Sequence, residues 1–470
     1  MRDVFQHRDT KKNYKNNSHI LLNPFNKLSV GIRKIRIISL CALCLCVSMF
    51  LKDSVHAVET RTLTLDQALA IATEKNRDIE KAREYARYVQ GKYVEERAAA
   101  LPQLGLSGSA IFSRDDSQGA LFGGNSYRQD SRALDLTLSQ PLFTWGKIGA
   151  AIRAAEVGLK TADEQLRLYR QAAFRDVTTA FYDVLLSREL DSQAVENLSQ
   201  KKRHLDEAQR RFSAGTATDY DILAAEVSVE NARPDVIRTA NAIRTAAERL
   251  RFLLALEGED VDAVGSLDIS PEQPRAYSEA LALALKRRPE LLDLKLRIGI
   301  YDELVTIAAA DDKPRLDLKG SAGWHWLDVN SSGTGREGNG AAWSAGVYLS
   351  FPFFDGLRSS GRAAQARSEA RTKQIEYARL ADSIALEIRN AGNSVRESSE
   401  IVQALSGTVR QAERLLQMVE KGFELGVKIR LEVNDAQLSL LQARSNLARA
   451  RRDYRVALVT YEWAMGTLGE

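Results

Sequence analysis

Cysteine, histidine and proline are all scarce in this sequence of 470 residues, which contains three, five and nine of them, respectively. The cysteines, Cys41, Cys44 and Cys46, all lie in one apolar run near the N-terminus, and removal of that run would leave no thiol for a disulfide or for cysteine chemistry. Beyond residue 57 the only histidines are His204 and His325, which lie in different segments. A metal site or an acid–base pair is therefore not expected, and we predict no enzyme, no catalytic residue and no cofactor.

Residues 1–57 have the pattern of a signal peptide. Basic residues at positions 33, 34 and 36 precede an uncharged apolar run at 37–51, and Val55-His56-Ala57 fits a small-residue cleavage site. The run is shorter than the roughly 20 residues that a membrane-spanning helix needs. Ten of the 66 Lys and Arg and three of the 62 Asp and Glu lie in this segment, so the remainder has a net charge of −3. That near-neutral balance does not favour nucleic acid as a partner.

The rest of the chain contains two copies of one unit, related by a shift of 211 to 212 residues. Two short motifs occur once in each copy: Pro102-x-Leu104-x-Leu106 with Pro314-x-Leu316-x-Leu318, and Phe212-x-x-Gly215 with Phe423-x-x-Gly426. We therefore predict a first structural repeat at 58–255, a linker at 256–275 that contains two prolines, and a second structural repeat at 276–470.

Each copy has long helical patterns. Residues 159–212 contain neither glycine nor proline, which predicts roughly 80 Å of helix. Apolar residues then recur every seven positions in each copy: Ile222, Val229, Val236, Ile243 and Leu250, and Val433, Leu440, Leu447, Tyr454 and Tyr461. A seven-residue repeat of this length is typical of supercoiled helices, and Pro234 predicts a local kink in the first of them.

Each copy also contains two stretches in which apolar and polar residues alternate, the period of a strand with one apolar face. Four strands are expected at about 104–113, 133–141, 316–328 and 343–352, with a polar loop at 330–339. A tilted strand of about ten residues crosses a bilayer, and this alternation is the signature of a membrane β-barrel. Even eight strands close into a barrel that side chains fill, so the smallest water-filled solution is three chains with twelve strands.

Three tryptophans, Trp324, Trp326 and Trp343, lie in the second pair of strands. Because an indole ring favours the boundary between lipid and water, we predict that they form a membrane aromatic belt. The alternative is core packing in an ordinary β-hairpin. His325 alternates with Trp324 and is expected to face the barrel interior, whereas His204, in a basic stretch, is expected on a solvated helix face.

Acidic residues follow each Phe-x-x-Gly turn where the next helix begins. Asp219 and Asp221 follow the first turn, and Glu432 and Asp435 follow the second. Helix capping and compensation of the helix dipole would account for all of them. The alternative is that Glu432 and Asp435, repeated threefold around an axis, form an acidic ring at the narrow end of a channel. The residues alone leave both interpretations open.

In their duplicated order, these motifs resemble the TolC family of outer-membrane efflux and secretion channels over nearly all of the chain beyond residue 57. The other segments that carry the resemblance are Leu65-Asp66-Gln67-Ala68-Leu69, Gln140-Pro141-Leu142-Phe143, Phe351-Pro352-Phe353-Phe354 and Asn434-Asp435-Ala436-Gln437. The resemblance implies a mainly α fold with a small β part. Long coiled-coil helices would form a periplasmic tunnel, and four membrane strands per chain would contribute to a twelve-strand trimeric β-barrel.

The resemblance further implies a homotrimer in the lipid of the outer membrane of a Gram-negative bacterium, extending into the periplasm. It would be the passive exit duct of a tripartite efflux pump or a type I secretion system. A periplasmic adaptor (membrane fusion) protein and an inner-membrane pump of the RND, ABC or MFS type would open its periplasmic end. The turns at Gly215 and Gly426 would face the adaptor.

Individual gate positions carry over with the same resemblance. Glu432 and Asp435 fall where the family has the acidic residues of the periplasmic gate. Asp221 and Lys428 fall where contacts tie neighbouring coiled coils shut. Glutamate at 432 and lysine at 428 depart from the family's more usual aspartate and arginine.

Two other classes of protein compete with this interpretation. A periplasmic coiled-coil adaptor without membrane strands would share the helices, the signal peptide and the lack of cysteine, but the four alternating strands argue against it. An exported enzyme would need clustered histidines, cysteines or paired carboxylates in one recognisable site, and the sequence shows none of these groupings.

Overall fold

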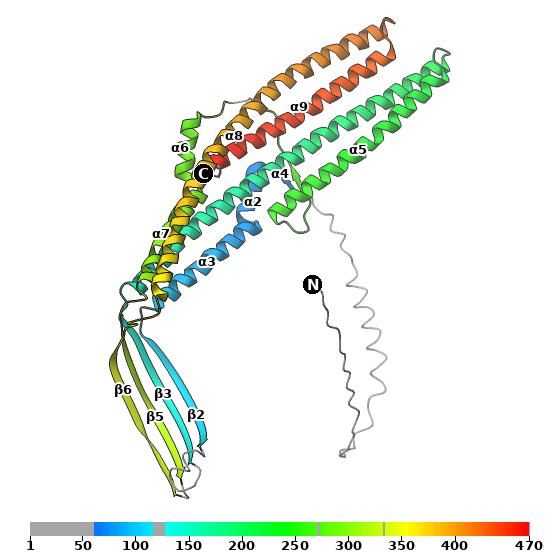
Figure 1. Ribbon diagram of the computed structural model, residues 1–470. Helices are drawn as coiled ribbons and strands as arrows, with labels where there is room; N and C mark the ends of the chain where they lie inside the picture. Colours follow the sequence, from blue (N-terminus) through cyan, green and yellow to red (C-terminus); the bar gives the residue numbers. More distant parts are fainter. Residues whose placement is uncertain (1–60, 116–126, 270–272, 332–333, 470) are drawn as a thin grey trace, which may run out of the picture. The chain divides into compact units, whose positions relative to one another are not determined.

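The computed structural model describes residues 61–115, 127–269, 273–331 and 334–469 (Figure 1). The predicted signal peptide at 1–57 lies outside the described residues. Among the helices in these ranges, none combines the length and the apolar character needed to cross a membrane.

Each copy of the duplicated unit builds two short and two long helices. The first copy forms α2 (Leu65–Lys75), α3 (Arg77–Ala98), α4 (Lys147–Ser213) and α5 (Asp219–Leu254), and the second forms α6 (Tyr277–Arg287), α7 (Pro289–Ala309), α8 (Arg358–Glu424) and α9 (Arg430–Met465). Both α4 and α8 have 67 residues, and both α5 and α9 have 36. At 1.5 Å per residue, α4 and α8 are about 100 Å long. The predicted duplication and the predicted long helices are confirmed.

The helix α4 begins at Lys147, ahead of its predicted start at 159. The prediction stopped at Gly158 because glycine is a weak helix former. In the structure α3 packs against α4, and a Cβ atom at Gly158 would lie 3.5 Å from Cγ1 of Val89 on α3. That distance is an ordinary van der Waals contact, so the close packing of α3 and α4 does not require glycine at 158. Packing against α3 instead stabilises the helix through Gly158 despite the intrinsic cost of glycine, about 1 kcal/mol.

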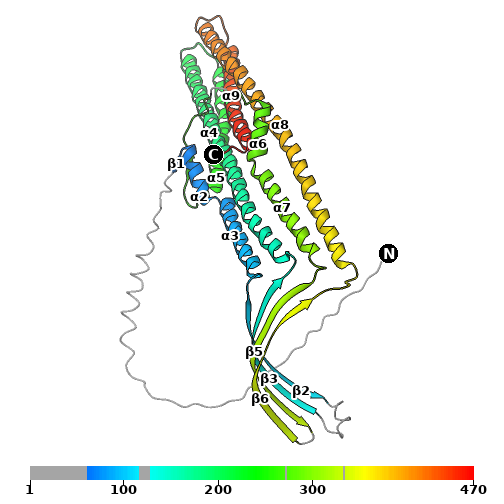
Figure 2. The same cartoon turned by 90° about the vertical axis from the view of Figure 1, so that its left-hand side faces the viewer.

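The long helices form two hairpins, α4–α5 and α8–α9, whose turns lie away from the strands (Figures 1 and 2). In the second hairpin all five large heptad residues are buried: Val433, Leu440, Leu447, Tyr454 and Tyr461. The predicted heptad seam is thus confirmed there. In the first hairpin Val229 and Leu250 are buried, and α5 continues as a helix through Pro234.

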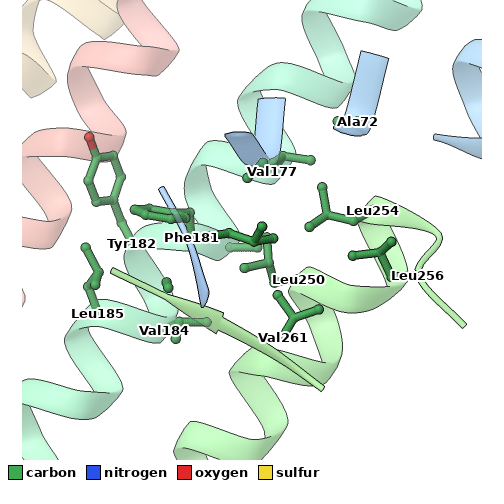
Figure 3. Close-up of a cluster of buried hydrophobic side chains, with 14 of the residues drawn as sticks. Ala72, Val177, Phe181, Tyr182, Val184, Leu185, Leu250, Leu254, Leu256 and Val261 are labelled. Atoms are coloured by element: carbon green, nitrogen blue, oxygen red, sulfur yellow. The ribbon is translucent and has the colours of Figure 1, made fainter. Parts of the chain in front are cut away.

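Each copy has a hydrophobic core of its own. The first core joins α2, α4 and α5, with Val177, Val184 and Leu250 fully buried at its centre (Figure 3). The second core joins α6, α7, α8 and α9 around residues such as Ile388 and Val395. Two smaller clusters lie wholly within the α8–α9 hairpin. No buried apolar cluster in the described ranges contains residues of both copies, so each hairpin is held together separately.

A two-stranded parallel sheet was not predicted from the sequence. It pairs β1 (Arg61–Leu63) with β4 (Val261–Ala263), which lies inside the segment predicted as a linker. Leu63, Val261 and Ala263 are buried in the first core. Strands of three residues are too short to show a period of two, which is why the alternation of residues does not reveal them.

The larger sheet has four antiparallel strands in the order β2-β3-β5-β6. They are β2 (Gln103–Asp115), β3 (Tyr127–Phe143), β5 (Arg315–Ser331) and β6 (Thr334–Ser350). The expected loop at 330–339 is wrong, because Ser331 pairs with Thr334 and β6 runs through most of that segment. Glycines at 335, 338 and 340 hide the alternation there, whereas pairing with β5 depends on backbone groups that glycine retains.

The end of α9 packs against the bend between α6 and α7. Arg288, at this bend, is 4% exposed, pairs with Glu290 and Glu387, and its guanidinium carbon lies 4.8 Å from the ring centroid of Trp463 on α9. Gly466 ends α9 with φ of +71°, and a Cβ atom there would lie 2.9 Å from the Arg288 backbone nitrogen. Glycine at 466 is thus required both by the backbone conformation and by the close contact.

We expect Gly466→Ala to lower the free energy of unfolding by about 1–3 kcal/mol, because it adds a clash to a left-handed conformation. Thermal unfolding in detergent, followed by circular dichroism, measures the effect. Gly258→Ala is the matched control, since Gly258 has φ of +77° but no neighbouring atom within 4 Å of the position that a Cβ atom would take. An equal loss of stability in the two variants would contradict the packing role of Gly466.

Candidate functional site

The register of the larger sheet places its apolar residues on one face. Leu106 pairs with Leu136, Leu136 with Ala322, and Ala322 with Trp343, so one row of the sheet is apolar across all four strands. These side chains are not covered: Leu106 is 73% exposed and Trp343 is 80% exposed. A contiguous exposed apolar face of this kind marks a surface that meets lipid or another protein. The predicted alternation of the four strands is confirmed.

The opposite face of the sheet is polar. His325 Nε2 lies 2.9 Å from Asp135 Oδ1, Ser321 and Ser344 share a hydrogen bond of 2.8 Å, and the Lys319 ammonium lies 5.3 Å from the ring centroid of Tyr348. His325 therefore lies on the polar face, opposite to the side of Trp324, as predicted. In the rows nearer the helices, the two faces of the sheet therefore have opposite chemistry.

The polar face continues into a cleft of about 890 Å³ between the helices and the base of the sheet. Ser139 and Ser350 line it from the polar face, while Lys92 on α3 and Arg297 on α7 line it from the helices. The lining is mixed, because apolar side chains such as Ile148, Ile300 and Leu304 also contribute to it. Within the described ranges no group of three or more His, Cys, Asp or Glu side chains is placed to hold a metal ion.

Aromatic side chains gather at two levels of the sheet. The three predicted belt residues, Trp324, Trp326 and Trp343, are all exposed and share the apolar face. A second group, which the sequence did not single out as a belt, lies where the strands join the helices: Phe143, Trp145, Phe351, Phe353 and Phe354, all exposed. Its signal in the sequence is the Phe-rich motif that follows the last strand of each copy.

The turns at the far ends of the hairpins have the same geometry. Gly215 and Gly426 both have φ of +72°, with nothing near the position of a Cβ atom, so these glycines supply a backbone conformation rather than space. The Gly215 N–H donates to the Phe212 carbonyl (2.8 Å), and the Gly426 N–H donates to the Phe423 carbonyl (3.0 Å). The Phe-x-x-Gly motif is thus the stop signal of α4 and α8.

Asp221 and Glu432 both act as helix caps. The Thr218 N–H donates to Asp221 Oδ2 (2.8 Å), and this bond lowers the pKa of Asp221 below its ordinary value. Glu432 accepts from Lys428 Nζ (2.5 Å) and from the Ile429 N–H (3.1 Å), and these two bonds lower the pKa of Glu432. The capping interpretation therefore describes both carboxylates within one chain.

Asp435 differs from these two acidic residues. Its carboxylate is exposed and has no hydrogen bond or ion pair among those found in the described part of the chain. Lys428 pairs with Glu432, and in the single chain it does not contact Asp221. The structure thus brings Lys428 and Glu432 together and leaves Asp435 open to solvent.

His204 is not on a solvated helix face, so that expectation is wrong. The ring is half-buried and contacts Arg430 and Gln437 on α9. The basic stretch around it suggested solvent because charged residues usually project into water. The contact with α9 depends on packing between residues more than 200 positions apart, for which the local sequence carries no signal.

Comparison with known proteins follows the same duplicated pattern. The family model described as "Outer membrane efflux protein" matches residues 68–256 and again 280–467. The outer membrane protein TolC of Escherichia coli is 25% identical over 390 residues, which cover 81% of this chain and 77% of TolC. The alkaline protease secretion protein AprF of Pseudomonas aeruginosa is 26% identical over 385 residues, which cover 80% and 78% of the two chains.

Among solved structures, the Campylobacter jejuni CmeC outer membrane channel superposes with a TM-score of 0.74 at 16% identity, covering 86% of this chain and 85% of that one. This likeness shows a shared fold. The two matches of the family model together span well over half of the chain. The chain therefore belongs to the outer membrane efflux protein family and is an outer-membrane channel that extends into the periplasm.

Proposed function

We propose that this chain works as a homotrimer, as a passive exit duct without chemistry of its own. A periplasmic adaptor protein and an inner-membrane pump open it at the ends of the helical hairpins. The observation that supports this best is the sheet with one exposed apolar face and one polar face that continues into the cleft between the helices. An adaptor without membrane contact would have no use for such an apolar face.

The edges of the sheet support a trimer. The order β2-β3-β5-β6 leaves β2 and β6 with a partner on one side only within the described chain. In a bilayer, unpaired backbone groups cost several kcal/mol each, so the edges have to pair with strands of other chains. Because even eight strands enclose only side chains, twelve strands from three chains are the smallest barrel that leaves a channel.

The two aromatic groups support a position for the bilayer. On β5, Leu316 lies level with Phe143, and Trp326 lies ten residues further along. Ten residues of strand span roughly 33 Å, which a typical tilt of about 40° reduces to about 25 Å of height. This matches the apolar band of an outer-membrane barrel. We infer that Trp324, Trp326 and Trp343 form the outer belt and that the phenylalanine-rich group forms the periplasmic one.

At the other end, Asp435 is the best candidate for an acidic ring at the gate, because its carboxylate is exposed and unpaired in the described chain. Glu432 supports the ring less strongly, since it caps α9 and pairs with Lys428. We propose that Asp221 and Lys428 tie neighbouring hairpins together across chains. The turns at Gly215 and Gly426 are the surfaces for the adaptor.

The exported cargo depends on the partner pump. AprF is named for secretion of an alkaline protease, and CmeC as an outer membrane channel. Within this proposal the chain serves either a tripartite efflux pump or a type I secretion system, with a pump of the RND, ABC or MFS type. The channel itself supplies the path and the gate.

We expect the purified chain without residues 1–57 to give discrete, cation-selective openings in a planar lipid bilayer. Its mass in detergent is expected to correspond to three chains, because the sheet closes only with two further copies. Conductance recording and light scattering on the same sample test both points. A water-soluble protein that gives no conductance would overturn the proposal in favour of the periplasmic adaptor.

We expect Asp435→Asn to raise the single-channel conductance or to weaken cation selectivity by about twofold or more, because it removes three clustered negative charges. Adding Glu432→Gln is expected to change little further. Asp382→Asn is the matched control, since Asp382 is also exposed but lies on α8 far from the turn. Conductance and selectivity equal to those of the unmodified channel would exclude Asp435 from the gate.

A further inference from the structure

The two hairpins meet along a polar interface between α4 and α9, here called the hairpin seam. Arg452 pairs with Asp183 (2.6 Å), and the Ser445 hydroxyl donates to Gln193 Oε1 (2.8 Å). Each buried apolar cluster of the described chain lies within one copy, so this seam is held by hydrogen bonds, ion pairs and cation–π contacts such as that of Arg175 with Trp463. Near the turns, only a few such interactions hold the two hairpins together.

The last contacts of the seam before the turns centre on Arg430, the first residue of α9. Its guanidinium donates to His204 Nδ1 (3.0 Å) and to Glu207 Oε2 (3.1 Å), both on α4. It also lies 4.7 Å from the ring centroid of Phe423, near the end of α8, and the guanidinium carbon of Arg211 on α4 lies 5.1 Å from the same centroid. The set of Arg430, His204 and Glu207 is called the tip contact below.

The tip contact requires a neutral histidine. An arginine only donates, so His204 Nδ1 has to accept with its lone pair. The proton of the neutral ring is then on Nε2, which lies 3.0 Å from the amide of Gln437. With its oxygen turned toward the ring, this amide accepts a hydrogen bond from the Nε2–H group of His204.

The charges around His204 oppose its protonation. Lys201 on α4 and Arg430 on α9 are positive, and Glu207 on α4 is negative. Asp221 on α5 faces Arg430, while α8 contributes the uncharged Phe423. Burial, and then the charges of Arg430 and Lys201, lower the pKa of His204, against the smaller opposite effects of Gln437 and Glu207.

We propose that the tip contact holds the two hairpins together in a pH-dependent way. Protonation of His204 in an acidic periplasm breaks this contact and favours opening of the channel. A protonated ring has no lone pair for Arg430 and places a further positive charge beside it. This inference rests on the proposed function, because it assigns a regulation to the same gate.

The direction of the pH effect follows from the neutral form of His204 in the closed contact. Above the ordinary pKa of histidine, about 6.5, the ring is neutral in both arrangements and the contact keeps its full strength. As the pH falls below that value, His204 takes up a proton more readily when the tip contact is broken than when it is intact. The population of the closed arrangement therefore decreases progressively. A tenfold difference in proton affinity changes the ratio of released to closed arrangements by up to about tenfold at each tip contact, and a trimer has three such contacts.

The test is the open probability of the trimer in planar bilayers at about pH 7.5 and about pH 5, a range in which histidine titrates. We expect it to rise by about threefold or more on acidification for the unmodified chain. His204→Gln, which keeps an acceptor but cannot take up a proton, is expected to abolish the rise. The control His325→Gln changes the other described histidine and should keep it. An equal rise in His204→Gln would overturn the inference.

A second measurement does not depend on conduction. The sequence has no cysteine beyond residue 57, so spin labels at Ser213→Cys and Glu424→Cys report on the ends of the two hairpins. We expect the distance between labels to increase at low pH, and to stay constant when His204→Gln is added. A constant distance in the unmodified background would overturn the inference. Absence of channels at every pH would instead overturn the proposed function, while the labels still test the tip contact.

Discussion

The backbone at the edges of the four-stranded sheet imposes the constraint on which the rest of the structure depends. β2 and β6 each have one partner in the described chain, and the apolar face between them is exposed. A sheet of this kind is stable in a bilayer only if its edges meet further strands. In the proposed trimer this closure turns the polar face inward, so that the cleft between α3, α4 and α7 continues the inner surface of the barrel.

The helical hairpins are under a different constraint, because they have to be long and still able to move relative to each other. Each copy buries its apolar residues in its own core, and the contact between hairpins is polar. Separation of the hairpins near their turns therefore breaks hydrogen bonds, worth about 0.5–1.5 kcal/mol each, without opening a hydrophobic core. A gate built on such a seam responds to small changes in binding or charge.

The acidic residues after the turns show how one residue type serves two purposes. Asp221 and Glu432 cap helices, which is the simpler of the two interpretations that the sequence left open. Lys428 and Glu432, the two departures from the family pattern, pair with each other within the chain. That pairing leaves Asp435 as the exposed carboxylate near the second turn. Asp435 is therefore the better candidate for the gate residue.

The sequence by itself determined the duplication, the long helices and the two-faced strands, because these features repeat with periods of about 211, 7 and 2 residues that local composition reveals. Tertiary structure alone decided the β1–β4 pair, the early start of β6, the continuation of α4 through Gly158 and the contact of His204 with Arg430. The physical reason is the same in each case. A strand of three residues, a glycine-rich strand, a helix crossing and a seam between repeats are all stabilised by partners distant in the chain, so local periodicity carries no record of them.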